Sequence, residues 1–232
     1  MNKVSNGLWL TIAAVLFGCC IYLSVGHFKS YDRAVSVRGL CEKEVMADRA
    51  IYPIAYTESG ENLAALYSKV KSQNAIIIDF LKQQGFKDDE ISIVAPTLTD
   101  RLSMSYSGGQ TSPRYVIKSG VNVCTDNIEA VLDMQTKQSQ LMEQGIAIGS
   151  GNSWENPVVF EFIGLNEIKP EMIKQANENA REAANQFAKD SHSRLGKIKS
   201  ATQGLFTIEN RDVNTPHIKK IRVVTSVSYY LK

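Results

Sequence analysis

Cysteine is the residue type with the most versatile chemistry in this sequence, and the chain has four. Cys41 and Cys124 lie in segments that alternate as strands, whereas Cys19 and Cys20 lie inside an uncharged N-terminal segment. In an oxidising compartment Cys41 and Cys124 could form a disulfide, and otherwise they are two half-buried strand thiols. Because no C-x-x-C occurs, the sequence does not support a thioredoxin-like redox site.

The other residue types that catalyse reactions or bind metals are scattered along the chain. His27, His192 and His217 have no neighbour at i+2, i+3 or i+4 that suits zinc or iron. The P-loop, G-x-G-x-x-G and G-x-S-x-G motifs are absent. We therefore expect no metal site, no cofactor and no catalytic residue, and a protein that is not an enzyme. Trp154 follows a glycine-rich stretch, where it could anchor a protein interface or pack locally.

The charges give no indication of a nucleic-acid partner. The chain has 26 basic and 24 acidic residues, a formal net charge of +2, and nucleic-acid binding domains usually show a clearly basic stripe instead. One local cluster, Lys219, Lys220 and Arg222, lies at the start of a strand-like segment. We expect a solvated strand end there, with a contact to phosphate or lipid headgroups as the alternative.

The N-terminal segment decides where in the cell the chain is expected. Residues 8–25 are uncharged, and their 18 residues exceed the roughly 17-residue minimum for a helix that crosses a bilayer. Trp9 and Tyr22 stand near its ends, where amphipathic rings favour the headgroup zone. This pattern predicts a single transmembrane anchor at residues 8–25. Residues 1–7 are then a cytoplasmic N-terminus and residues 26–34 a juxtamembrane linker.

Two other interpretations of this segment stay open. Residues 16–19 are similar to a lipoprotein signal, with Cys19 as the lipidated residue, but Phe17 is bulky for its position and the apolar stretch continues beyond the cleavage point. A cleaved secretory signal normally has a shorter apolar stretch and a small-residue exit, which is not visible here. We expect an uncleaved anchor.

The orientation of the chain in the membrane is argued from its flanking charges. Lys3 precedes the apolar segment, and Lys29, Arg33 and Arg38 follow it. Taken alone, this bias would keep the C-terminal side in the cytoplasm, but long domains are translocated largely regardless of charge. We expect the globular part to be exported, partly because of the family resemblance described below.

The globular part has a periodicity that repeats. Alternating strand patterns begin near residues 49, 91 and 114, and an amphipathic helix begins near residue 61. The same order of strand, helix, strand and strand follows from residues 157, 169, 197 and 218. Alternating strands with helices on one face predict an α+β fold rich in antiparallel sheet. We expect one domain at residues 35–232, with pseudo-repeats at about 35–124 and 126–232.

Local signals place the helices of the second half. Asp126 and Glu129 form a D-x-x-E capping box for a helix that ends near Glu143. Pro170 suits the first turn of the next helix. That helix has an alanine-rich inner face, which lets it approach the sheet closely. The predicted inner face is Ile173, Ala176, Ala180, Ala183, Ala184, Phe187 and Ala188.

Three short segments give the chain a family resemblance. Residues 35–48 are similar to the opening signature of the SIMPL-domain family, and residues 81–91 and 179–198 fit it too. The match extends over residues 33–232. The resemblance implies a bacterial protein that is exported or anchored in the inner membrane, with its globular domain in the periplasm and a possible role in oxidative-stress defence. The family has no agreed catalytic residues, so none is carried over.

These observations leave three hypotheses for function. The first is a membrane-anchored envelope scaffold that forms homo-oligomers, with unpaired strand edges as possible contacts. The second is a module that binds a small periplasmic ligand, a glycan or a peptide, in a cleft between the repeats. The third is an enzyme or a peroxide-scavenging factor that acts through Cys41 or Cys124.

Overall fold

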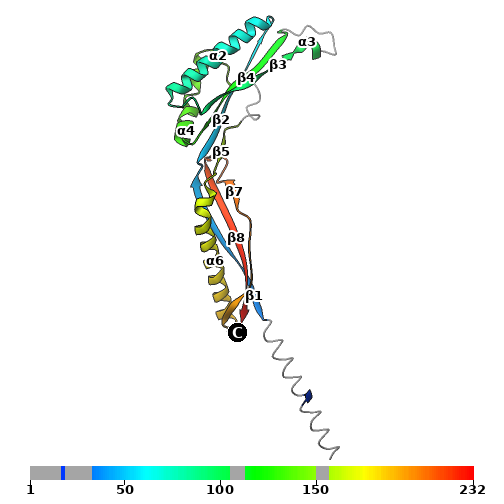
Figure 1. Cartoon of the computed structure of the whole chain (residues 1–232), viewed down its shortest axis with the longest axis vertical. Helices are drawn as coiled ribbons and strands as arrows, with labels where there is room; N and C mark the ends of the chain where they lie inside the picture. Colours follow the sequence, from blue (N-terminus) through cyan, green and yellow to red (C-terminus); the bar gives the residue numbers. More distant parts are fainter. Residues whose placement is uncertain (1–16, 19–32, 105–112, 150–156) are drawn as a thin grey trace, which may run out of the picture. The chain divides into compact units, whose positions relative to one another are not determined.

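The computed structural model describes residues 17–18, 33–104, 113–149 and 157–232, and they form an α+β fold of antiparallel sheets and several helices (Figure 1). The predicted fold class is confirmed at this level. The chain divides into two compact units. Unit 2 comprises residues 44–165 and 209–220, and unit 1 comprises the remainder of the chain, residues 1–43, 166–208 and 221–232.

Unit 2 is built on a four-stranded sheet. Its elements are β2 (Arg49–Gly60), α2 (Leu63–Gln83), β3 (Ile91–Asp100), α3 (Arg101–Met104), β4 (Tyr115–Thr125), α4 (Ile128–Lys137), α5 (Ser139–Glu143) and β5 (Val159–Glu161). The strand order is β3-β4-β2-β5, and every neighbouring pair is antiparallel. Side chains at alternate positions of β2 point to one face, so Ala50, Tyr52, Ile54 and Tyr56 are all buried there, where α2 and α4 pack.

The short strand β5 covers only part of the β2 edge. Its last register pair is Ile51 with Val159. The next hydrogen-bonding pair in this register would be Pro53 with Pro157, and neither proline has the N–H that a ladder requires. The pairing therefore ends at Ile51, and the strand predicted from residue 157 onward is only three residues long.

Asparagine side chains begin the two longer helices of unit 2. Asn62 Oδ1 accepts from the Ala65 N–H at 3.1 Å, and Asn127 Oδ1 accepts from the Ala130 N–H at 3.1 Å. The predicted capping box of Asp126 with Glu129 is therefore wrong, because the neighbouring amide of Asn127 takes the capping position. The helix predicted to reach Glu143 is divided at Gln138 into α4 and α5.

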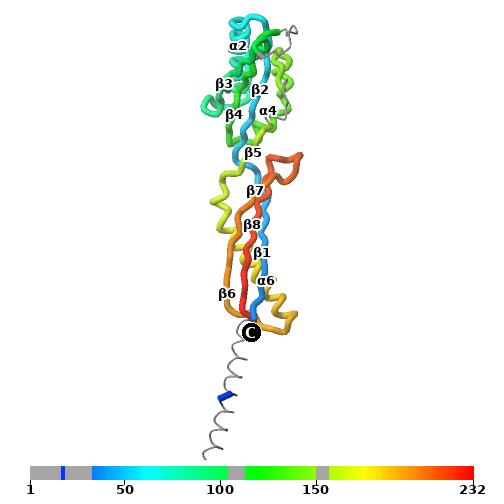
Figure 2. Tube along the Cα trace, turned by 90° about the vertical axis from the view of Figure 1, so that its right-hand side faces the viewer, coloured from blue at the N-terminus to red at the C-terminus, as the bar shows by residue number. Residues whose placement is uncertain are grey.

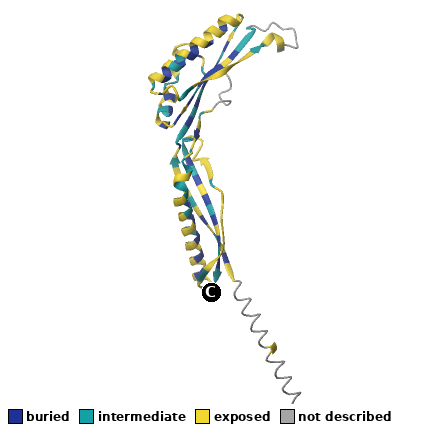
Figure 3. Ribbon diagram, in the orientation of Figure 1, coloured by how far each residue is buried: buried dark blue, intermediate teal, exposed yellow. Residues whose placement is uncertain are grey.

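Unit 1 pairs strands from the two ends of the chain. Its elements are β1 (Ala34–Met46), α6 (Leu165–Asp190), β6 (Leu195–Gln203), β7 (Thr207–Asn210) and β8 (Ile218–Leu231), although residues 44–46 of β1, residue 165 of α6, residues 209–210 of β7 and residues 218–220 of β8 belong to unit 2. The strand order is β1-β8-β6, with β7 also paired to β8, and Figure 2 shows β1, β8 and β6 side by side. The Ser36 and Ser228 hydroxyls lie 2.7 Å apart, which places the start of β1 beside the end of β8. Buried and exposed residues alternate along β8, as predicted (Figure 3).

The helix α6 packs very closely on β1 through small residues. Ala176, Ala180, Ala184 and Ala188 are buried, as the alanine pattern predicts. A Cβ atom at Gly39 would lie 1.8 Å from the Ala176 carbonyl oxygen and 2.5 Å from the Ala180 nitrogen, so only glycine fits this position. The close contact of helix and strand therefore depends on Gly39 as much as on the alanines.

Two details of α6 differ from the prediction. The helix begins at Leu165, so Pro170 lies inside it rather than in its first turn. Asp48 supports this early start, since its two carboxylate oxygens accept from the Ile163 and Gly164 N–H groups, each at 2.7 Å. Phe187, predicted to face the core, is exposed, because the smaller alanines already fill the contact with the sheet.

The sheets of the two units have strand orders that can be compared position by position. Unit 2 has the order β3-β4-β2, and unit 1 has the order β6-β8-β1. The strand of unit 1 at the place of β2 is therefore β1, whereas the segment from residue 157 joins the sheet of unit 2 as β5. The two compact units are thus made of interleaved segments of the chain, and the pseudo-repeats at about 35–124 and 126–232 stay a prediction.

The predicted anchor at residues 8–25 lies outside the described residues, apart from Phe17 and Gly18. Within the described ranges, no helix is both long and apolar enough to span a membrane. The lipoprotein alternative at Cys19 also lies outside them. The anchor stays a prediction.

Candidate interaction surface

In each unit the helix leaves one strand of the sheet uncovered. The helix α2 contacts β4 and β2, and β3 is exposed on both faces along most of its length. In unit 1, β8 buries alternate residues, whereas β6 is exposed almost throughout. Ile93 on β3 and Ile198 on β6 are each 58% exposed. Two strands at matching places in their sheets therefore present apolar side chains to solvent.

In unit 1 this uncovered face forms a groove of about 540 Å³. One side is α6 and the other is formed by β6 and β8. The lining residues are Pro170, Ile173, Lys174, Asn177, Glu178, Arg181, Ile198, Ala201, Val227 and Tyr229. Apolar side chains come from both sides, and the charged residues of the lining all come from the helix. An apolar centre with a polar rim is the usual composition of a protein–protein interface.

The edges of the two uncovered strands carry features that oppose strand addition. The β6 pairing with β8 has register shifts on both sides of Ile198, and Lys197 and Lys199 flank that residue. The β3 pairing has a register shift between Val94 and Thr97, a segment that contains Pro96. Bulges, lysines and proline are the devices by which natural sheets avoid edge-to-edge pairing. The groove face, rather than the strand edges proposed above, is thus the better candidate contact.

Unit 2 contains a second concave site, a pocket of about 420 Å³. Its walls are strands β2, β3 and β4, the end of α4 and residues 148–149 and 157–158. The amides of Asn122, Gln135 and Gln138 and the hydroxyls of Thr57 and Thr97 line it, together with apolar residues. A volume of this size is within the range of small-molecule sites. The pocket lies within unit 2, and a ligand site in a cleft between the repeats stays a prediction.

A buried polar cluster that sequence reasoning missed lies beneath α2. The Glu58 carboxylate accepts from Lys69 Nζ at 2.7 Å and from Gln73 Nε2 at 2.6 Å. Glu58 and Gln73 are both buried, and Gln73 Oε1 has no hydrogen-bond partner. Glu58 extends the buried series of alternate residues on β2, so strand alternation was the signal that could have identified it.

A second chain of hydrogen bonds runs beside this cluster. The Tyr56 hydroxyl donates to the Val70 carbonyl and to Asn74 Oδ1, each at 2.9 Å, and Asn74 Nδ2 donates to Ser119 Oγ at 3.2 Å. Burial raises the pKa of Tyr56, an effect that the Ser119 hydrogen bond opposes and the nearby Glu58 charge reinforces. These contacts join α2 to β2 and β4. They fix the position of the helix on the sheet, and Tyr56 and Ser119 also line the pocket of unit 2.

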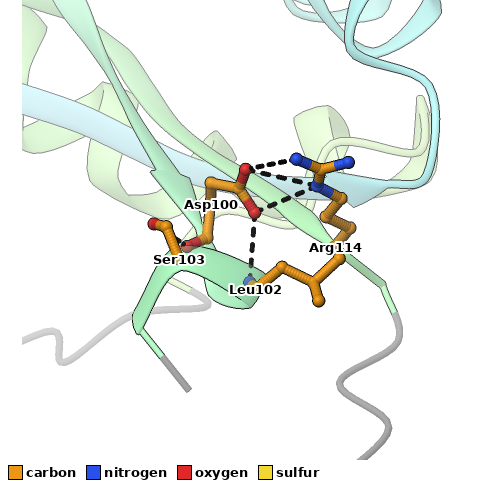
Figure 4. Close-up of polar contacts among 4 residues, drawn as sticks. All are labelled: Asp100, Leu102, Ser103 and Arg114. Atoms are coloured by element: carbon orange, nitrogen blue, oxygen red, sulfur yellow. Dashed lines mark hydrogen bonds and ion pairs between the residues drawn. The ribbon is translucent and has the colours of Figure 1, made fainter. Parts of the chain in front are cut away.

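An ion pair closes the β3–β4 hairpin at its α3 end (Figure 4). Arg114 donates to Asp100 through Nε at 3.1 Å and Nη2 at 2.8 Å, and the Leu102 N–H also donates to the same carboxylate. The Arg114 hydrogen bond holds the pKa of Asp100 below its usual value. The guanidinium also lies 4.7 Å from the centre of the Tyr115 ring. The ion pair therefore stabilises this end of the hairpin.

Cys41 and Cys124 are free thiols in the structure, one in each unit. Cys41 is half-buried on β1, and burial, with a further contribution from Glu171, raises its pKa. A raised pKa lowers the fraction of reactive thiolate, which weakens the case for a peroxide-reactive cysteine at this position. Cys124 is exposed on β4. The disulfide between them stays a prediction.

The two thiols should react with an alkylating reagent at different rates. Because Cys124 is exposed and Cys41 is half-buried with a raised pKa, we expect iodoacetamide at pH 7.5 to modify Cys124 on the order of tenfold faster. Mass spectrometry of peptides after timed quenching measures both rates. If neither thiol is modified until a reductant is added, the predicted disulfide exists in the isolated protein.

The basic cluster that was predicted at a solvated strand end is only partly exposed. Lys219 is buried rather than solvated, and its ammonium donates to Asn210 Oδ1. Burial lowers its pKa, against the opposing effect of Glu161. Arg222 lies 3.7 Å from a Glu42 carboxylate oxygen and is exposed, as expected of a strand end. Trp154, the predicted interface anchor, lies outside the described residues.

The described part of the chain contains no group of three or more His, Cys, Asp or Glu side chains placed to hold a metal ion. His217 packs against Phe160 instead, edge to face, with ring centres 5.9 Å apart. Two concave surfaces are therefore candidate interaction sites: a groove in unit 1 and a pocket in unit 2.

Comparison with protein families gives one match over most of the chain. Residues 35–223 match the SIMPL family, which is described as a protein of unknown function (DUF541). The chain therefore belongs to the SIMPL family, which confirms the resemblance seen in its sequence. Comparison with curated proteins finds no significant match.

Proposed function

We propose that this protein is a non-enzymatic envelope scaffold, anchored in the inner membrane by residues 8–25, whose copies associate through the groove of unit 1. Its globular domain then lies in the periplasm, and a contribution to oxidative-stress defence fits the family resemblance. We also propose that the two units are copies of one ancestral strand-helix-strand-strand unit. The matching strand orders β3-β4-β2 and β6-β8-β1 support this duplication.

The observation that carries the proposal is the uncovered face between α6 and β6. Ile198 projects from β6 with 58% of its surface exposed, next to Ile173, Val227 and Tyr229 in the groove lining. A monomeric protein gains nothing from an exposed apolar groove, and contiguous exposed apolar surface commonly marks an interaction site. A second copy that covers the groove would remove Ile198 and the partly exposed Ile173 from water, whereas Val227 and Tyr229 are already buried.

Light scattering of the detergent-solubilised full chain tests the association. We expect an oligomer for the parent, and we expect Ile198→Lys to weaken the association about 30-fold or more, because a charge at the apolar centre of an interface costs about 2 kcal/mol or more. Ile93→Lys is the matched control, since Ile93 is equally exposed on the corresponding strand of unit 2. The control should leave the oligomer unchanged.

A strictly monomeric parent at high protein concentration would contradict self-association. An oligomer that dissociates equally in both variants would move the interface away from the unit 1 groove. Circular dichroism of each variant separates dissociation from unfolding.

The pocket of unit 2 favours a second candidate function, binding of a small uncharged ligand. Its lining offers amide and hydroxyl groups from Asn122, Gln135, Gln138, Thr57 and Thr97, one cation, Lys118, and no carboxylate. A glycan or a short neutral peptide fits this chemistry better than a cation does. A thermal-shift screen of both classes tests it, and a parent that none of them stabilises counts against this candidate.

A further inference from the structure

One end of unit 1 gathers the ends of three strands. The Leu231 N–H donates to the Arg33 carbonyl at 2.8 Å, and Arg194 and Lys232 exchange two backbone hydrogen bonds of 2.7 and 2.8 Å. The start of β1, the start of β6 and the end of β8 are therefore held side by side, and both ribbon views show the C-terminus beside the start of β1 (Figures 1 and 2). The backbone ladder fixes the positions of the residues at this end.

The side chains at this end are mainly cationic. Arg33, Lys189, Arg194, Lys197 and Lys232 are all exposed, and none of them makes an ion pair within the described part of the chain. Among the described residues, the anionic groups at this end are Asp190, which accepts from Gln186, and the terminal carboxylate. These residues have five cations against two anions, a local excess of three positive charges, and Asp32, next to Arg33 in the sequence, lies outside the described residues.

Arg33, at this basic end, follows the predicted anchor closely in sequence. Residues 26–33 separate the apolar segment from the start of β1 at Ala34. Eight residues span at most roughly 30 Å when fully extended. A chain anchored through residues 8–25 therefore keeps Arg33 and its neighbours near the bilayer, where cations gain from anionic headgroups within a Debye length of about 8 Å.

We propose that the basic end of unit 1, formed by Arg33, Arg194, Lys197 and Lys232, docks on the anionic phospholipid headgroups of the membrane that holds the chain. The inference rests on the proposed anchor. The docking adds a second, electrostatic contact, which orients unit 1 against the lipid surface. Exposed cations on hydrogen-bonded strand ends suit the phosphate groups of a lipid surface, which are spread over a plane and need no shaped pocket.

Vesicle flotation of the full chain tests the docking separately from the anchor. The anchor is disabled by Val15→Asp with Ile21→Asp, which interrupts the apolar segment without adding positive charge. Each protein is mixed with vesicles of phosphatidylcholine alone or with phosphatidylglycerol at about 30%, at 50 mM and 500 mM salt. The docking variant adds Arg33→Gln, Arg194→Gln and Lys197→Gln, and the matched control adds Lys71→Gln, Lys87→Gln and Arg101→Gln, three exposed cations of unit 2.

The parent with its anchor should float with both kinds of vesicle at either salt. The anchor-disabled chain should float only with the anionic vesicles at low salt, because each cation near an anionic surface strengthens binding roughly fivefold and salt screens that gain. The docking variant should bind about 100-fold more weakly, and the matched control should bind as the anchor-disabled chain does.

Each failure has a different meaning. If the parent does not float, the proposal that residues 8–25 anchor the chain is contradicted. The anchor-disabled chain still tests the docking by itself. Docking is overturned if the anchor-disabled chain ignores anionic vesicles, if it binds neutral vesicles equally well, or if the docking variant and its control lose binding to the same extent. Thermal unfolding of the variants confirms that they are folded.

Discussion

Replacing Gly39 with alanine should destabilise unit 1 by about 3 kcal/mol or more. The new Cβ would lie 1.8 Å from the Ala176 carbonyl oxygen and 2.5 Å from the Ala180 nitrogen, and both are backbone atoms that no side-chain rotation can move. The helix α6 must therefore shift away from β1, which also loosens the packing of its alanines. Overpacking of a core usually costs 1–3 kcal/mol, and a backbone clash places this change at or above the upper end.

Chemical denaturation of the two proteins, with hydrogen exchange to locate the effect, measures this prediction. Gly60→Ala is the matched control in unit 2, because a Cβ there would meet only the Leu66 side chain at an ordinary 3.6 Å. We expect the control to lie within about 0.5 kcal/mol of the parent. A Gly39→Ala protein with parental stability would mean that α6 does not pack on β1 at this distance.

Breaking the buried Glu58 cluster should have the second large effect. In Glu58→Ala the buried Gln73 side chain loses the acceptor for its Nε2 group, and its Oε1 is already without a partner. An unsatisfied buried amide together with the new cavity should cost about 2–4 kcal/mol. Lys69 contributes little to the loss, since its side chain is 58% exposed and returns to water.

The double variant Glu58→Leu with Gln73→Leu separates the effect of unpaired buried polar groups from the effect of lost side-chain volume. Replacing both buried partners with apolar residues of similar size should bring stability back to within about 1 kcal/mol of the parent. Glu182→Ala, at an exposed position of α6, serves as the control for loss of a glutamate. If the double variant is as unstable as Glu58→Ala, the polar contacts of Glu58 and Gln73 themselves stabilise the position of α2. The absence of unpaired buried groups is then not sufficient for stability.

Local periodicity predicted most elements of this fold. Alternation along β8 and β2 identified the buried faces, and the alanine series at Ala176, Ala180 and Ala184 identified the face of α6 that meets the sheet. Each of these signals arises from residues that are neighbours in one element. Such residues share a face whatever the element packs against.

Strand partners could not be predicted in the same way. The pairing of β1 with β8 joins residues such as Ser36 and Ser228, which are far apart in the chain, and nothing in either strand specifies the other. The sequence therefore indicated the order of strands and helices, whereas the pairing of β5 with β2 and of β1 with β8 is known only from the structure. Pro53 and Pro157 explain where the first of these pairings ends, but their meeting is visible only once the register is known.

The candidate surfaces were only partly visible in the sequence. Ile173 and Phe187 have the spacing of core residues on α6, yet Phe187 is exposed and Ile173 lines the groove, because the helix covers β1 and β8 and not β6. The polar cluster at Glu58 was overlooked since an acidic residue near a strand end normally faces solvent. In both cases the deciding fact is which strand the helix covers.

The measurement that tests self-association most directly is photo-crosslinking of the full chain in its membrane. With a benzophenone amino acid in place of Ile198, we predict covalent dimers whose second attachment point lies in unit 1 of another copy. The same probe in place of Ile93 should give few or none. Absence of crosslinked dimers at position 198, or equal yields at both positions, would contradict an interface in the α6–β6 groove.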